Sequence, residues 1–145
     1  MRLLFVTVLC VVTAASAAAL SASAKVESGL FVVGHGQLTG GASVGVVAFS
    51  GPLGVRGRLV VESSPGFRFV SRVTCVSVVG TRVLVGGKIV RATNPVTIGN
   101  TSLVAIEDNG LNDRAGIAFS NSGLDTCPAF IPPMQDLTSG NFVVK

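Results

Sequence analysis

Short valine-rich runs, separated by Gly, Pro, Asn and Asp, recur from residue 29 to the end of the chain. Valine and other β-branched residues favour extended backbone, whereas the separating residues favour turns. Good helix formers are scarce, so the pattern predicts an all-β protein. The predicted strands are Gly29–Val33, Ala42–Ser50, Val55–Glu62, Phe67–Val79, Arg82–Arg91, Thr101–Asp108, Ala115–Ser120 and Asn141–Val144.

About eight short, mostly sequential strands fit a single antiparallel β-barrel, with a β-sandwich as the alternative. A barrel leaves no exposed edge strand, because its last strand pairs with its first. The best hairpin is VSVVGTRVLV, in which Gly80 precedes Thr81 and suits a type II′ turn. The segment Thr126–Ser139 contains three prolines and is predicted to be a crossover that leads to the last strand.

One predicted strand, GFRFVSRVTC, alternates apolar and basic side chains. Phe67, Phe69, Val73 and Cys75, together with Ser71, occupy every second position, and successive side chains in a strand point to opposite faces. This alternation predicts that the four apolar side chains share the buried face and that Arg68 and Arg72 lie on the opposite, exposed face.

The first 24 residues have the features of a secretory signal peptide. Arg2 is followed by the apolar stretch Leu3–Val12 and by small residues that end in Ala22-Ser23-Ala24. We therefore expect cleavage near Ala24 and a single exported domain over residues 25–145. The apolar stretch is shorter than the ~20 residues that span a bilayer, so we expect no membrane insertion.

The predicted domain contains ten basic and seven acidic residues, a net charge of +3. This mild excess predicts weak attraction to anionic surfaces and no dedicated nucleic-acid binding. Basic side chains also follow several predicted strands and would form one outer stripe if those strands are neighbours. The stripe would consist of Arg56, Arg58, Arg68, Arg72, Arg82 and Lys88. It is a candidate site for a cell-wall or other extracellular polyanion, and is otherwise an ordinary solvated face.

Two cysteines, Cys75 and Cys127, belong to the predicted domain. In an oxidising compartment such a pair most simply forms one disulfide. The loop that this bond closes contains about 50 residues, which corresponds to ~4 kcal/mol in the chain-entropy account. A two-cysteine metal site is the alternative, but the nearby sequence offers no further ligands.

One motif suggests catalysis at first sight. GASVG, Gly41–Gly45, matches the nucleophile elbow of serine hydrolases, which needs a strand-to-helix turn and a later histidine. The residues that follow continue as a strand, and the single histidine, His35, precedes Ser43. We therefore assign no catalytic residue and expect that the protein is not an enzyme, with a secreted hydrolase as the least favoured alternative.

The stretch EDNGLNDRAG, Glu107–Gly116, concentrates acids and asparagines between two predicted strands. Its DNG sequence is a strong turn signal, which predicts a hairpin loop. Asp108 and Asp113 also carry the oxygen ligands that calcium prefers, although the EF-hand spacing is not met. A calcium site at Asp108 and Asp113 is therefore an open alternative, and no other cofactor is expected.

The order of motifs resembles a known family. The motifs are GHGQL at Gly34–Leu38, ASVG at Ala42–Gly45, GRL at Gly57–Leu59, the cysteine hairpin Val73–Val85, IEDNG at Ile106–Gly110, CP at Cys127-Pro128 and GNFVV at Gly140–Val144. In this order the sequence resembles the post-COAP type of domain found in exported, chiefly actinobacterial proteins. It departs from that pattern at the hairpin, which has Gly-Thr in place of Gly-Asn, and after the DNG. The resemblance implies a compact β module without catalytic residues to transfer.

Together these observations predict a secreted, monomeric β module with a binding or structural role at the cell envelope or outside the cell. The competing hypothesis is a small-ligand-binding barrel, in which apolar side chains line a cavity instead of filling the interior.

Overall fold

The computed structural model describes residues 29–121, 127–128 and 130–145. The predicted signal peptide, residues 1–24, lies outside the described residues. No helix in the described part of the chain is long and apolar enough to cross a membrane. The elements are β1 Phe31–Leu38, β2 Ser43–Gly51, β3 Gly54–Ser63, β4 Phe67–Val79, β5 Arg82–Ala92, the 3-10 turn η1 Pro95–Thr97, β6 Thr101–Glu107, β7 Arg114–Ser120 and β8 Gln135–Val144.

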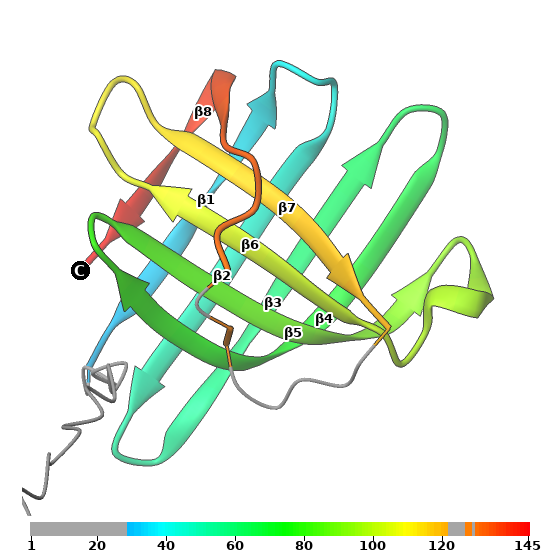
Figure 1. The fold of residues 1–145 in the computed structure, drawn as a ribbon, viewed down its shortest axis with the longest axis horizontal. Helices are drawn as coiled ribbons and strands as arrows, with labels where there is room; N and C mark the ends of the chain where they lie inside the picture. Colours follow the sequence, from blue (N-terminus) through cyan, green and yellow to red (C-terminus); the bar gives the residue numbers. More distant parts are fainter. Residues whose placement is uncertain (1–28, 122–126, 129) are drawn as a thin grey trace, which may run out of the picture.

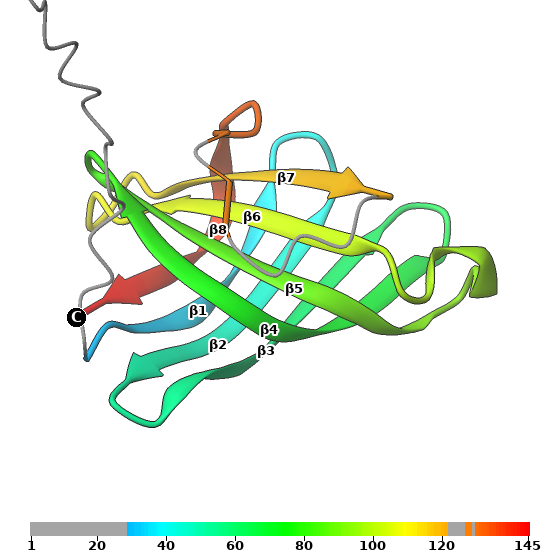
Figure 2. The ribbon, with the colours of Figure 1, turned by 60° about the horizontal axis from the view of Figure 1, so that its bottom comes forward.

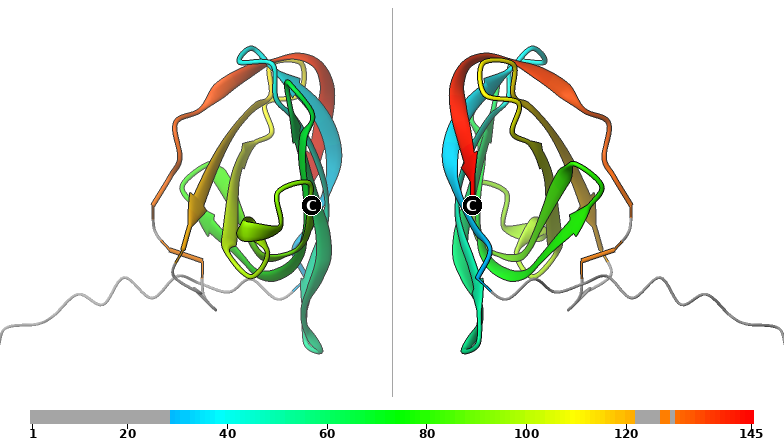
Figure 3. Two further views of the ribbon diagram at one scale, coloured as in Figure 1. Left: turned by 90° about the vertical axis from the view of Figure 1, so that its right-hand side faces the viewer. Right: turned by 90° about the vertical axis from the view of Figure 1, so that its left-hand side faces the viewer.

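The eight strands form one antiparallel sheet that closes on itself (Figure 1). Each strand pairs with the next along the chain, and β8 pairs with β1 from Val32–Val144 to Leu38–Leu137. Viewed from either side, the strands surround one interior (Figure 3). The predicted all-β antiparallel barrel is therefore confirmed.

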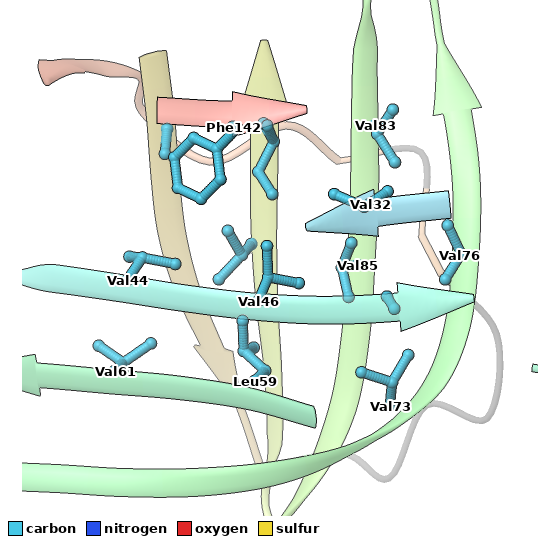
Figure 4. Packing of buried hydrophobic residues seen from close by; sticks show 14 of the residues in the cluster. Val32, Val44, Val46, Leu59, Val61, Val73, Val76, Val83, Val85 and Phe142 are labelled. Carbon is cyan, nitrogen blue, oxygen red and sulfur yellow. The ribbon is translucent and has the colours of Figure 1, made fainter. Parts of the chain in front are cut away.

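Packed side chains fill the interior of this barrel (Figure 4). Leu59, Phe69, Val104 and Phe142 each have none of their surface exposed. Inward-facing valines from most of the strands pack around them, as the period-two alternation requires. Among the buried polar side chains, Ser71 and Ser102 satisfy each other through a 2.7 Å hydrogen bond between their hydroxyls.

A register shift in β4 changes which face Cys75 occupies. Val73 pairs with Gly87, but Cys75 pairs with Gly86, so Thr74 is an extra residue, a β-bulge. After the bulge the alternation is reversed, and Val76 belongs to the interior cluster. The prediction that Cys75 shares the interior face with Phe67 and Phe69 was wrong, because alternation holds only while the ladder is uninterrupted.

The outward Cys75 forms the predicted disulfide with Cys127. Residues 127–128 and 130–134 pass over the outer side of the barrel, in orange before β8 in Figure 1. Beneath them lies a second apolar cluster, whose buried members are Leu84, Leu103 and Ala105. The disulfide therefore fastens this crossover segment to the sheet that it covers.

Strand β8 begins at Gln135, earlier than the predicted Asn141. Strand β1 extends to Leu38, although Gly34 and Gly36 were expected to follow its end. A side chain at Gly34 would collide with the main chain at Asn141, so glycine there permits the close approach of β8. These glycines are thus sites of strand contact and do not interrupt the strand.

The predicted hairpins are confirmed at both glycine turns. Gly80 and Thr81 form the two-residue loop between β4 and β5, and Gly80 has φ +64°. That value suits the first central position of a type II′ turn. The DNG sequence lies between β6 and β7, where Gly110 has φ +76°.

Candidate functional site

Strands β3, β4 and β5 lie side by side (Figure 2). Their outer face carries a row of basic residues. Arg58 of β3 is the direct partner of Arg72 in β4, and Arg72 is the direct partner of Lys88 in β5. All three residues are exposed. The sheet therefore places three positive side chains next to one another, one on each strand, and we call Arg58, Arg72 and Lys88 the cationic row.

A fourth exposed cation, Arg91, lies beside this row and was not among the residues predicted for the stripe. Strict alternation from the outward Lys88 would turn Arg91 into the interior. Opposite β4, however, Ser71 pairs with Ile89 and Val70 with Arg91, so Val90 is an extra residue. This bulge turns Arg91 outward, beside Val70. The only local signal in the sequence was a β-branched run that ends in Arg91, and such a run does not indicate a bulge.

Two residues of the predicted stripe have acidic partners. Arg68 Nε lies 2.6 Å from Glu62 Oε1, on the same outer face. Arg82 lies next to the β4–β5 turn, at the far end of β5 from Arg91, and its Nε is 2.8 Å from Glu107 Oε2. The structure therefore brings Arg58, Arg72 and Lys88 together, places Arg68 at their border, and does not place Arg82 with them.

The cationic row and Arg91 are not neutralised within the described part of the chain. The ion pairs there involve Arg68, Arg82 and Arg114 and none of those four residues. Arg56, further along β3, lies with its guanidinium 5.1 Å from the centre of the Phe49 ring. The positive charge of the row is therefore available to a ligand.

Between the basic residues, the outer face has an apolar floor. Val60 and Val70 are direct partners in β3 and β4, and Gly45 lies next to Val60 in β2. A hollow of ≈ 320 Å³ is lined by Val70, Arg58, Arg72 and Arg91, among others. On the other side, a hollow of ≈ 610 Å³ includes Val60, Gly45, Arg58 and Arg68. Both are open and shallow, so they suit an extended ligand better than an enclosed small molecule.

The acidic β6–β7 loop serves the closure of the barrel. Strands β7 and β8 pair at only two positions, Arg114–Asp136 and Ala115–Gln135. Beyond them, Asp113 Oδ2 accepts a hydrogen bond of 2.6 Å from the main-chain N–H of Phe142, and Asp108 Oδ2 accepts one of 3.0 Å from that of Val144. The two carboxylates therefore accept hydrogen bonds from main-chain N–H groups of β8 that have no acceptor in β7.

The remaining oxygens of these aspartates are also engaged. Asp113 Oδ1 accepts from the N–H of Asn109 at 2.9 Å, and Asp108 Oδ1 accepts from that of Gly110 at 3.2 Å. Among the described residues no group of three or more His, Cys, Asp or Glu side chains could hold a metal ion. The calcium prediction for Asp108 and Asp113 is not tested by this geometry and stays a prediction.

Glu107, next to this loop, has a lowered pKa. A side-chain hydrogen bond from Asn109 is the largest cause, and the hydrogen bond from Arg82 is the second. Asn109 Nδ2 donates to Glu107 Oε1 at 3.0 Å, while Arg82 Nε donates to Oε2 at 2.8 Å. Both donors stabilise the charged carboxylate. The bond from Arg82 also joins the β4–β5 hairpin to the β6–β7 hairpin.

The motif GASVG does not form a nucleophile elbow. Ser43 opens β2, which continues as a strand to Gly51, and Gln37 is its partner in β1. His35 is exposed and pairs with Gly45. Within the described residues no hydrogen bond joins His35 to Ser43.

Comparisons of this chain with protein-family models, with curated proteins and with solved structures found no match. The resemblance to the post-COAP type of domain therefore stays a prediction from the sequence.

Proposed function

We propose that this protein is a secreted, non-catalytic, monomeric β module that binds an anionic polymer at the cell envelope or outside the cell. The binding surface is the outer face of β3–β5, formed by the cationic row and Arg91. The disulfide between Cys75 and Cys127 is compatible with an extracellular location, where such bonds persist.

The observation that carries this proposal is the direct cross-strand pairing of like charges. Like charges opposite each other in a sheet are destabilising, whereas opposite charges contribute roughly 0.2–1 kcal/mol per pair. The same face contains a favourable pair at Glu62 and Arg68, yet Arg58, Arg72 and Lys88 face one another in succession. A bound polyanion would relieve this repulsion. Binding therefore explains an arrangement of charges that does not stabilise the fold.

The alternative of a small ligand inside the barrel has less support. Its interior positions are occupied by packed side chains such as Leu59, Phe69 and Phe142. The hollows at the cationic row lie on the outer face, where a polymer can lie without a limit on its length.

Salt-gradient elution from immobilised heparin, used as a general polyanion, tests the proposal. Arg58→Glu and Arg72→Glu should each weaken retention, by roughly five- to tenfold in affinity at low salt, because each reverses one charge of the row. Lys145→Glu is the matched control, because it makes the same change of charge at an exposed residue outside the row. If all three variants elute together, binding follows net charge alone and the proposal is wrong.

A further inference from the structure

The direction of the cationic row constrains the ligand that it can bind. Its three members lie on three successive strands, so the row runs across the strands and not along one of them. Neighbouring strands lie about 4.8 Å apart, and directly opposed Cα atoms are about 5 Å apart. The row therefore presents one positive charge roughly every 5 Å over a span of about 10 Å.

The apolar floor next to the row constrains the ligand further. Val60 and Val70 lie side by side between the row and Arg68, and Val70 has only 7% of its surface exposed. Binding of single-stranded nucleic acid relies on exposed aromatic rings on which bases stack. Phe69, which precedes Val70 in β4, is fully buried and offers no such ring. The floor can instead contact the C–H face of a sugar ring.

Hydroxyl-bearing side chains continue the surface toward one end of the barrel. A hollow of ≈ 420 Å³ there is lined by Ser43, Ser63, Ser64 and Thr93, together with Gln37 and Glu62. Arg68 lines this hollow and also the larger hollow over Val60, so the two adjoin. Hydroxyl, amide and carboxylate groups are the partners that sugar hydroxyls need.

We infer that the bound polymer is an acidic polysaccharide with about one carboxylate per sugar. Its chain lies across β3, β4 and β5, its carboxylates contact Arg58, Arg72 and Lys88, and its sugar rings lie against Val60 and Val70. The hydroxyl-lined hollow lies to one side of this chain, along β3 and β4 beyond Arg68. This inference rests on the proposed function and adds the class of polymer and its direction.

Binding of galacturonate oligomers of one to six sugars, measured by calorimetry at low salt, tests the class of polymer. Affinity should increase until the oligomer has three or four carboxylates, which is enough to span the row, and change little beyond that length. Linear polyphosphates with the same number of charges should bind more weakly, because they cannot use the valine floor. Equal or tighter binding of polyphosphate would overturn the inference.

Two single variants test the direction. Lys88→Ala and Arg56→Ala each remove one exposed cation from the same outer face, but only Lys88 continues the row across the strands. Lys88→Ala should weaken binding of the galacturonate tetramer by roughly two- to fivefold, and Arg56→Ala should leave that binding nearly unchanged. A loss at Arg56 equal to that at Lys88 would show that the polymer does not lie across the strands.

The heparin experiment separates the two levels of the argument. If heparin retention depends on Arg58 and Arg72 but galacturonate oligomers do not bind, the inference fails and the proposed function stands. If heparin retention does not depend on those residues, both fail.

Discussion

The carboxylate of Asp113, which is buried in the β6–β7 loop, accepts a 2.6 Å hydrogen bond from the main-chain N–H of Phe142 in β8. Phe142 itself is fully buried in the barrel interior. One side chain therefore joins the loop to the last strand at the side of the barrel where β7 and β8 pair at only two positions. The acidic loop is, in this respect, a part of the closure of the fold.

Removal of this carboxylate should be costly. Asp113→Ala leaves the N–H groups of Phe142 and Asn109 without their acceptor, and an unsatisfied buried donor costs about 1–3 kcal/mol. We expect a loss of about 3 kcal/mol in the free energy of unfolding, measured by urea denaturation. Asp108→Ala is the control, because Asp108 is exposed and water can replace it, so a loss below about 1 kcal/mol is expected there. Equal losses in the two variants would contradict the role given to Asp113.

Glu107 should make stability depend on pH in the acidic range. Its pKa is lowered in the folded protein, by the hydrogen bond from Asn109 and then by that from Arg82, so its contribution is present above the pKa of the unfolded chain, about 4.3. That contribution is lost as the pH falls through the lower, folded value. Glu107→Gln should therefore be less stable than the parent protein near neutral pH, and the difference should shrink from about pH 6 to about pH 3. A difference that stays constant over this range would contradict the prediction.

Loss of the disulfide should destabilise the barrel without changing its strands. The bond joins residues 52 positions apart, and closing a loop of this length corresponds to about 4 kcal/mol in the chain-entropy account. We expect a reductant, or the double variant Cys75→Ser with Cys127→Ser, to lower the free energy of unfolding by up to that amount. Circular dichroism should still report β structure, because the interior cluster does not depend on the crossover segment. Loss of the β signal on reduction would show that the bond is needed for the fold itself.

The calcium prediction is open to a direct test. Each of the four carboxylate oxygens of Asp108 and Asp113 accepts a main-chain N–H, so a calcium ion would compete with those donors. We therefore expect the melting temperature to be the same in calcium and in chelator. A rise in the melting temperature with calcium that is absent in Asp108→Asn would instead establish the site.

Local signals in the sequence were enough for the strands, their turns and the disulfide. Valine-rich runs and the glycines of the Gly80-Thr81 and DNG turns act over a few residues, so their conformations can be predicted without knowledge of the partner strand. Strand ends were less predictable. Gly34 and Pro133 look like interruptions in the sequence, yet Gly34 lies inside β1, and β8 begins only two residues after Pro133.

Only the tertiary structure decided which side chains of the candidate site come together. Bulges at Thr74 and Val90 reverse the alternation, so Cys75 and Arg91 lie on the outer face, where a strict period of two would place neither. The register of β3, β4 and β5 aligned Arg58, Arg72 and Lys88 and left Arg82 with Glu107. Such placements depend on the pairing between strands distant in sequence. The sequence by itself therefore determined the class of fold and its turns, and the closed ladder determined the surface that we propose binds the polymer.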